Sequence, residues 1–219
     1  MTKLKLSLTI LLLVLACGSK LPGLRQQLDS PDADKRIAAA KALAEAKDTA
    51  AVMKLCEHLA DSVPDVRKEC ARALGKIGDA RAAQPLAAFY GKETIEDVAD
   101  AGARALVQLG QAAVKPLIGL LGSIRPSVRS GAARGLGRLA ARDAVDPLIW
   151  LLDDRDESVR IAAVFALRQI GDSRGLDAIA RKVQDTDEDV ESAAEKALSG
   201  EGYQEGLDRA KRIIRRTHR

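Results

Sequence analysis

The segment Val159–Gly171 reads VRIAAVFALRQIG, and variants of these thirteen residues recur along most of the chain. Successive copies start 31, 32, 30, 31 and 31 residues apart, at Lys35, Val66, Val98, Val128, Val159 and Val190. A constant period in this range predicts stacked structural repeats rather than one globular core, because each repeat buries its apolar face against its neighbours. The sequence therefore predicts one elongated repeat domain over residues 21–200.

Each repeat is expected to be a pair of α-helices, and the fifth repeat displays the pattern most clearly. Pro147 is expected to open the first helix, where its missing N–H costs nothing, and leucines follow on one face. Those leucines are Leu148, Leu151 and Leu152. Six such pairs predict an all-α fold, an α-solenoid of about six stacked helix pairs.

The second helix of the fifth repeat has a predicted start, core face and end. Asp156 is expected to cap its N-terminus, and Gly171 to end it in a left-handed conformation, a place that Gly78 and Gly110 occupy in their own repeats. Small and apolar residues at helical spacing are expected to face the core. They are Val159, Ala163, Ala166, Leu167 and Ile170.

These residues also carry a family resemblance. The chain resembles HEAT-repeat proteins, in particular the short repeats found in phycobilisome lyases, through its Val-Arg pairs, Ala-Ala pairs and Ile-Gly-Asp ends. The Val-Arg pairs begin at Val66, Val128 and Val159. The resemblance implies that second helices line a concave face, that first helices form the convex face, and that the protein binds partners. Lys35, Ala99 and Glu191 depart from the pattern.

Residues 1–16, which read MTKLKLSLTILLLVLA, predict an export signal. Two lysines precede an apolar run of 11 residues from Leu6 to Ala16, which is too short to span a bilayer and suits a secretory signal. Ala16 followed by Cys17 resembles the bacterial lipobox, which implies a signal peptide over residues 1–16 and lipid chains such as palmitate on Cys17. Gly18 then implies the outer membrane. The alternatives are an ordinary cleaved signal or an incorrect start site.

Charge is concentrated at the two ends of the chain. The formal net charge is +4, yet residues 17–207 hold 27 basic and 30 acidic residues, and residues 208–219 hold six basic residues and one acidic residue. Residues 201–219 therefore predict a basic helix or tail, which caps the last repeat or lies on anionic lipid. Nucleic acid is not expected as a partner, because aromatic residues for base stacking make up only 2% of the chain.

One exposed column of the second helices is strongly cationic. Six residues after the start of each repeated segment stand Lys41, Arg72, Arg104, Arg134, Phe165 and Lys196. Stacking would align them as a positive stripe for an acidic partner, with Phe165 as an apolar anchor. The alternative is that these cations serve solubility and pair with nearby acids such as Glu69 and Asp100, at about 0–1 kcal/mol for each exposed pair.

Trp150 and Phe89 stand in a column that is not predicted to be buried. Other members of that column are Gln26, Glu57 and Arg181. An exposed tryptophan would be an anchor for a protein interface. The alternative is a side chain folded over a neighbouring helix or filling a gap left by Gly119.

Cys56 and Cys70 fall in the two helices of the second repeat, and the sequence leaves open whether they form a disulfide or remain two buried thiols. An oxidising compartment permits a bridge. Cys70 aligns with alanines and with Gly102, which indicates a crowded and buried column.

Metal chemistry is not predicted. His58 and His218 are the only histidines, too few for a zinc or di-iron site, and this argues against the HEAT-like deoxyhypusine hydroxylases. The acidic run from Asp185 to Asp189 lacks the glycine and the final glutamate of a calcium loop, and predicts the capped start of a helix. The sequence predicts no metal, cofactor, catalytic set or small-molecule substrate.

Together these features predict a non-enzymatic protein. The expected function is a membrane-anchored HEAT-repeat scaffold that binds a protein partner in the bacterial cell envelope, at the outer membrane facing the periplasm. The surfaces expected to bind are the cationic column and the region of Phe165 and Trp150. The alternative is an accessory subunit of an enzyme, which the resemblance to phycobilin lyases implies.

Overall fold

The computed structural model describes residues 20–199. Where the repeat predicts one continuous array, the chain divides into two compact units with their boundary between Leu109 and Gly110. Cys17 and residues 201–219 lie outside the described residues, so the predicted lipid anchor and basic tail stay predictions. Between residues 20 and 199, none of the helices combines the length and the apolar character that crossing a bilayer requires.

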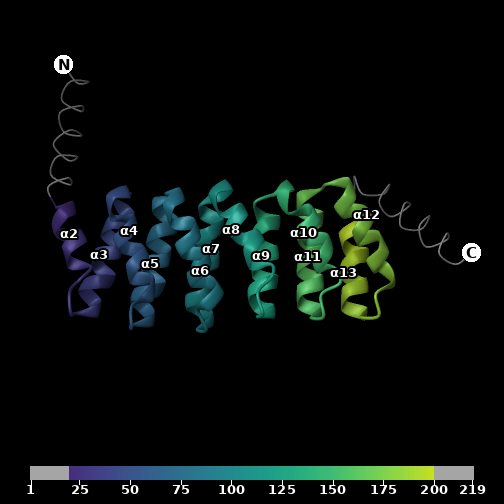
Figure 1. The fold of residues 1–219 in the computed structure, drawn as a ribbon, viewed down its shortest axis with the longest axis horizontal. Helices are drawn as coiled ribbons and strands as arrows, with labels where there is room; N and C mark the ends of the chain where they lie inside the picture. The colour runs from purple at the N-terminus through teal and green to yellow at the C-terminus, as the bar shows by residue number, and fades with distance from the viewer. Residues whose placement is uncertain (1–19, 200–219) are drawn as a thin grey trace, which may run out of the picture. The chain divides into compact units, whose positions relative to one another are not determined.

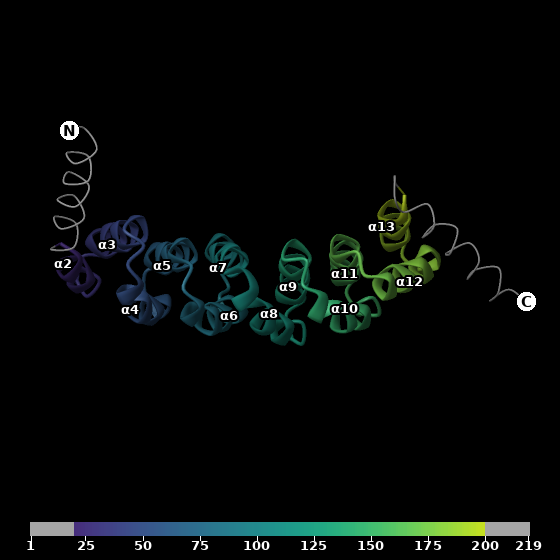
Figure 2. The same cartoon turned by 90° about the horizontal axis from the view of Figure 1, so that it is seen from above.

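Within residues 20–109, unit 1 consists of three helix pairs in two layers (Figures 1 and 2). The first helices are α2 (Leu21–Gln27), α4 (Val52–Glu57) and α6 (Ala83–Lys92). The second helices are α3 (Ala33–Glu45), α5 (Pro64–Ile77) and α7 (Glu96–Gln108). Helix α5 packs between α3 and α7, and each first helix packs on the second helix of its own pair.

Unit 2 repeats this arrangement within residues 110–199. Its first helices are α8 (Val114–Leu120), α10 (Val145–Leu151) and α12 (Ser173–Arg181). Its second helices are α9 (Pro126–Arg138), α11 (Glu157–Ile170) and α13 (Glu188–Leu198), with α11 packed between α9 and α13. Each unit is thus a short α-solenoid, which confirms the predicted all-α class and the helix pairs.

The core of each unit follows the columns of the repeat. Every second helix has a fully buried leucine in its C-terminal part, and the five core residues predicted in the fifth repeat are all buried. Burying one leucine contributes about 1.5–3 kcal/mol, so these columns stabilise each unit. Cys70 is fully buried among the small residues of its column, as its alignment predicted.

Two glycines let neighbouring second helices approach closely. A Cβ atom on Gly75 of α5 would lie 2.8 Å from the Cα of Ala105 in α7, and one on Gly137 of α9 would lie 2.8 Å from the Cα of Ala166 in α11. No side chain fits at either place without moving the backbone. The tight approach therefore depends on glycine in one helix facing alanine in the next.

The predicted helix ends are confirmed at Asp156 and Gly171. Asp156 caps α11 by accepting a hydrogen bond from the Ser158 N–H at 3.0 Å, and Gly171 has a left-handed φ of 71°. Gly78 and Gly110 share this conformation. Lys47 and Ala140 occupy the same column with φ values of 50° and 47°, a conformation that costs energy for any residue with a Cβ atom.

Two predictions about the first helices need correction. Pro147 does not open α10, because a 3-10 turn at Arg142–Ala144 runs into the helix, which begins at Val145 and places Pro147 in its first turn. Phe89 is buried, which contradicts the predicted exposure of its column and agrees with the alternative of a side chain folded over a neighbouring helix. Its ring packs over Gly102, where a Cβ atom would lie 3.1 Å away, so the missing side chain of Gly102 makes the space that Phe89 fills.

Candidate binding face

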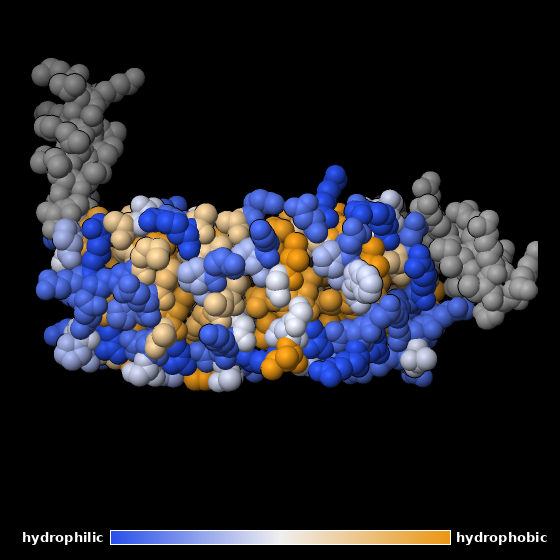
Figure 3. Space-filling model, viewed as in Figure 1, coloured by the Kyte–Doolittle hydropathy of each residue, from blue (hydrophilic) through white to orange (hydrophobic). Residues whose placement is uncertain are grey.

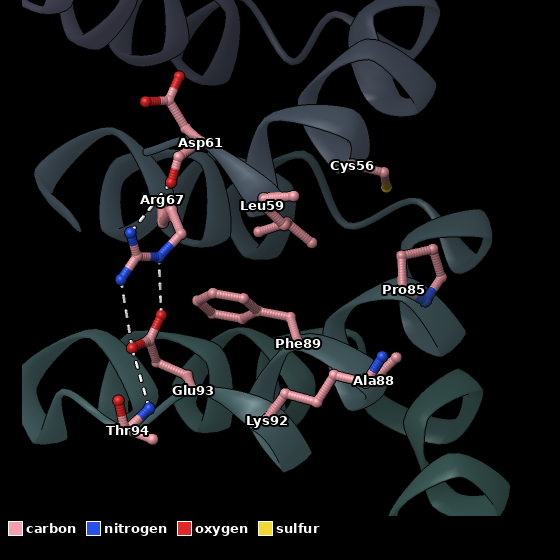
Figure 4. Close-up of a pocket in the computed structure, with 11 residues that line it drawn as sticks. Cys56, Leu59, Asp61, Arg67, Pro85, Ala88, Phe89, Lys92, Glu93 and Thr94 are labelled. Carbon is pink, nitrogen blue, oxygen red and sulfur yellow. Dashed lines mark hydrogen bonds and ion pairs between the residues drawn. The ribbon is translucent and has the colours of Figure 1, made fainter. Parts of the chain in front are cut away.

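One set of arginines is buried and links successive repeats. In unit 1, Arg36 donates from Nε to Asp61 of the next repeat at 2.8 Å and from Nη1 to the Ser30 carbonyl at 2.8 Å. Arg67 makes the equivalent bonds to Glu93 at 2.8 Å and to the Asp61 carbonyl at 3.0 Å (Figure 4). Each guanidinium therefore joins the turn of its own repeat to an acid in the following turn.

The acids in these pairs stay ionised. Burial acts to raise the pKa of Asp61, but hydrogen bonds from Arg36 and from the Val63 N–H outweigh it and hold that pKa below its usual value. The bonds from Arg67 are the main cause that lowers the pKa of Glu93. These charges are satisfied inside unit 1 and do not face a partner.

Unit 2 contains one tight arginine pair and one looser pair. Arg129 donates to Asp154 through Nη2 at 2.6 Å and Nε at 2.7 Å. Arg160 lies 3.6 Å from carboxylate oxygens of both Asp185 and Asp187, and its buried Nε has no hydrogen-bond partner among residues 20–199. Asp185 also accepts a bond from Lys182 at 3.0 Å, which explains the looser pairing with Arg160.

At two turns, a serine stands at the position where the other repeats have the acid that pairs with an arginine. The hydroxyl oxygens of Ser30 and Ser123 accept bonds from N–H groups two residues later, as the aspartates do at other turns. No arginine precedes Ser30 by one repeat, and Ala99 stands where the arginine would precede Ser123. An acid is therefore present only where the preceding repeat supplies an arginine, a coupling that the sequence analysis missed.

The residues of the predicted cationic column are all exposed, as expected for an outward-facing column. They are Lys41, Arg72, Arg104, Arg134, Phe165 and Lys196. In each unit, we call the surface on which these residues stand the second-helix face. What differs between them is whether an acid neutralises the charge.

In unit 1 the second-helix face is largely neutralised by its own acids. Arg72 lies 3.7 Å from Glu69, and Arg104 lies 3.8 Å from Asp100. Two further cations bridge neighbouring helices, since Lys68 of α5 bonds to Asp97 of α7 and Lys76 of α5 bonds to Glu45 of α3. Lys41 makes no ion pair with any residue that the structure describes.

In unit 2 the corresponding face is a groove between α9 and α11. The groove has a volume of about 450 Å³ and is lined by Arg134 and Arg138 of α9 and by Ile161, Phe165 and Gln169 of α11, among others. Neither arginine makes an ion pair within residues 20–199, and α9 contains no Asp or Glu that could supply one. The side chain of Phe165 is exposed at 41%. This groove is the strongest candidate site.

Trp150 and Lys196 do not line this groove. Trp150 is 80% exposed on α10, in the layer of first helices, and Lys196 is exposed on α13. The structure therefore separates Trp150 from Phe165, which the sequence analysis had grouped as one region. Other apolar patches also reach the surface between hydrophilic side chains (Figure 3).

A second hollow lies among the first helices of unit 1. It has a volume of about 500 Å³, and Leu59, Pro85 and Phe89 give it apolar walls (Figure 4). The charged groups of Arg67 and Glu93 at its edge bond to each other. Asp61, Lys92 and Thr94 also line the hollow, which therefore combines apolar walls with a polar edge.

Cys56 and Cys70 are free thiols in the structure. Burial raises the pKa of Cys70 to about 12 and that of Cys56 to about 11. Since the thiolate is the reactive form, neither sulfur is a reactive nucleophile at neutral pH.

The described residues contain no group of three or more His, Cys, Asp or Glu side chains placed to hold a metal ion. Asp187 caps α13 by accepting bonds from the N–H groups of Asp189 and Val190. Asp185 bonds to Lys182, as described above. The acidic run thus begins a helix, as predicted.

Comparison with known proteins gives one family. The family model for HEAT repeats matches residues 21–107, 114–199 and 145–217. No curated protein matches the chain.

Several solved structures are similar to this chain. The complex of CpcE and CpcF of phycocyanin lyase from Nostoc sp. has 24% identity and a TM-score of 0.51, with 85% of this chain and 78% of that chain covered. A designed armadillo repeat protein in complex with the peptide (KR)4 has 23% identity and a TM-score of 0.50, with 82% and 98% covered. Human deoxyhypusine hydroxylase has 21% identity and a TM-score of 0.42, with 81% and 83% covered. These likenesses concern the fold alone.

Proposed function

Because this chain belongs to the HEAT-repeat family, we propose that it is a non-catalytic scaffold that binds a protein partner through its second-helix face. The observation that carries the proposal is the groove between α9 and α11, where Arg134 and Arg138 have no acidic partner among the described residues. Unpaired cations steer an acidic partner and select against a basic one. Arginine and aromatic residues are also the types that carry most of the energy at protein interfaces.

The proposed scaffold is held at the membrane by lipid on Cys17, at the outer membrane facing the periplasm. The support is the sequence of residues 1–17, with its short apolar run and the small residue before the cysteine. Each buried CH2 of an acyl chain contributes about 0.8 kcal/mol, so two or three chains hold a protein almost permanently.

The test of partner binding compares two double variants of the full chain, expressed in its source cells and chemically cross-linked. Arg134→Glu with Arg138→Glu reverses the unpaired cations. Arg72→Glu with Lys76→Glu makes the same charge change at the same two columns in unit 1 and is the matched control. We expect the first variant to lose its cross-linked partner and the second to keep it. Equal capture by both variants and the wild-type chain would remove the groove from the proposal.

The anchor has a separate test, the intact mass of the chain extracted from membranes beside a Cys17→Ala variant. An acylated mass that begins at Cys17, absent from the variant, is the expected result. An unmodified mass that begins at Met1 in the soluble fraction would instead favour the role of an accessory subunit of an enzyme. That role is suggested by the fold that the chain shares with the CpcE and CpcF complex.

A further inference from the structure

We propose that the groove between α9 and α11 binds an extended segment of a partner protein in which an apolar residue stands between two acidic residues. This inference rests on the proposed function and adds the chemistry of the ligand. It follows from three features of the groove, namely the spacing of its cations, its apolar wall, and the absence of acids from α9.

The spacing of Arg134 and Arg138 determines how two carboxylates would meet them. The residues are four apart in α9, so their Cα atoms lie about 6 Å apart along the helix axis. In an extended segment, residues i and i+2 point to the same side and lie about 6.4–6.8 Å apart. Two acids separated by one residue therefore match the two guanidinium groups.

The opposite wall determines the residue between the two acids. Alternate side chains of an extended segment point to opposite sides, so the middle residue faces α11 when its neighbours face α9. Ile161 and Phe165 stand four residues apart on that wall, with Ala162 behind them. This part of the wall is apolar, with the uncharged polar residues Ser158 and Gln169 also in the lining, and it accepts an aliphatic side chain rather than a third charge.

Acids that would compete with such a ligand are present in unit 1 and replaced in unit 2. Asp97 and Asp100 bond to Lys68 and Arg104. The residues that align with Asp97 and Asp100 in α11 are Ser158 and Ile161. Similarly, Glu69, which neutralises Arg72, aligns with Gly131 of α9. The same columns therefore carry cations in both units, but the cations of α5 and α7 contact acids, whereas Arg134 and Arg138 of α9 are left for an external carboxylate.

The positive charge of the groove favours an acidic peptide over a basic one. Charged groups across an interface bind when their potentials are complementary, and like charges brought together are rejected. The designed armadillo protein noted above is described with the basic peptide (KR)4. With two unpaired arginines, this groove should instead reject basic segments.

The test measures binding of labelled heptapeptides to the full chain by fluorescence anisotropy at low salt. The probe is Gly-Ser-Glu-Leu-Glu-Ser-Gly, and the controls replace both glutamates with glutamine or the leucine with glycine. We expect the probe to bind at least tenfold more tightly than the glutamine peptide and to weaken when salt is raised. The glycine peptide should bind several-fold more weakly than the probe.

Two double variants locate the site. Arg134→Gln with Arg138→Gln should lose at least tenfold in affinity for the probe, while Arg72→Gln with Lys76→Gln should stay within twofold of the wild-type chain. Phe165→Ala should weaken the probe several-fold. All these residues are exposed, and far-ultraviolet circular dichroism confirms that each variant is folded.

Three results would overturn the inference. They are equal binding of the glutamate and glutamine peptides, equal losses in the two double variants, and tighter binding of phosphatidylglycerol vesicles than of the probe through Arg134 and Arg138. If the probe fails while Arg134→Glu with Arg138→Glu still abolishes capture of the cellular partner, only the proposed ligand chemistry is wrong. If both experiments fail, the scaffold proposal fails as well.

Discussion

The two units have the same helices and the same cationic column, yet their second-helix faces differ in charge. In unit 1, four cations on α5 and α7 contact acids on α3, α5 or α7. In unit 2, the groove between α9 and α11 leaves Arg134 and Arg138 without an acid among residues 20–199. The difference shows that a cation in a repeat column is available to an acidic ligand only where no acid of its own helix or of a neighbouring helix neutralises it.

The comparison also separates two kinds of arginine within one helix. Arg129 of α9 is buried and bonds to Asp154, while Arg134 of the same helix is exposed at the groove. The first joins successive repeats and the second is available to a ligand. The following experiments test the difference between the two units and between the two kinds of arginine.

Acid should have the largest effect, because it removes the carboxylate charge from the buried pairs of both units together. The pKa values of Asp61, Glu93, Asp154 and Asp185 are all lowered in the folded chain. A lowered pKa contributes stability that is fully present above the unfolded value of about 4 and is lost as pH falls through the folded value. We expect a flat free energy of unfolding from pH 7 to about 5 and a steep fall below about 4. Urea unfolding across this pH range measures the free energy of unfolding. A value that stays constant down to pH 3 would contradict the prediction.

Arg129→Ala should be the most destabilising single change in α9. It leaves Asp154 half-buried without its guanidinium partner, and breaking a buried pair in this way costs about 3–5 kcal/mol. Arg134→Ala is the control and should change stability by no more than about 0.5 kcal/mol, because it is an exposed residue. The midpoints of urea unfolding measure both variants. Similar losses in the two would break the division between the arginines.

Gly75→Ala and Gly137→Ala test whether both units depend on close approach of their second helices. Each new methyl group would lie 2.8 Å from a backbone atom of the next helix, and overpacking of this kind costs about 1–3 kcal/mol. The control is Gly119→Ala in α8, where a Cβ atom meets nothing within 4 Å. In thermal unfolding, Gly75→Ala and Gly137→Ala should both have lower midpoint temperatures than the Gly119→Ala control.

Exchanging the acids between the units would sharpen the comparison directly. Ser158→Asp with Ile161→Asp gives unit 2 the acids of unit 1 and should weaken the glutamate peptide by about tenfold, or 1.4 kcal/mol. Asp97→Ser with Asp100→Ile, combined with Glu69→Gly and Glu45→Gln to free Arg72 and Lys76, makes the reverse exchange and should create a second site in unit 1. Peptide anisotropy measures both exchanges. Unchanged affinity in the first would show that neutralisation does not control binding.

The smallest effect is expected at the two strained helix ends, one in each unit. Lys47→Gly and Ala140→Gly relieve a left-handed conformation at φ values of 50° and 47°. Each should stabilise its unit by about 0.5–1 kcal/mol, because glycine has no Cβ atom to clash. Gly171→Ala makes the reverse change in the same column and should destabilise by a similar amount. Urea unfolding measures all three, and no gain in the first two would argue against strain there.

Much of the fold could be predicted because the same pattern of residues occurs in six repeats. Burial follows the helical period of each segment, so the core residues of the fifth repeat and the cap at Asp156 were correct. Phe89 was predicted to be exposed because its column holds polar residues in other repeats. Its burial depends on Gly102 in the following helix, whose missing side chain leaves space for the Phe89 ring. The residue types in one column do not show such a compensation between two helices.

The candidate site was predicted only in part. The column containing Arg134 and Phe165 was found from its spacing. Trp150 was named beside Phe165 although the predicted helix order already placed it in a first helix, and the structure shows α10 and α11 in different layers (Figure 2). Arg138 and Ile161 were missed. The signal that could have found Arg138 is the absence of any acidic residue from α9, and the signal for Ile161 is that it stands where α7 has Asp100.

The sequence by itself determined the helix pairs, the buried columns and the exposure of the cations, since these depend on the residues of one repeat and their period. The pairs of Arg72 with Glu69 and of Arg104 with Asp100 lie within one helix and could also be predicted from spacing. The tertiary structure alone decided which cations are neutralised by a neighbouring helix. The pair of Lys68 with Asp97 and that of Lys76 with Glu45 each join residues about one repeat apart, and such contacts arise only when neighbouring helices pack side by side. The groove at Arg134 and Arg138 exists because that packing brings Ile161 and Phe165, and no acid, to face α9.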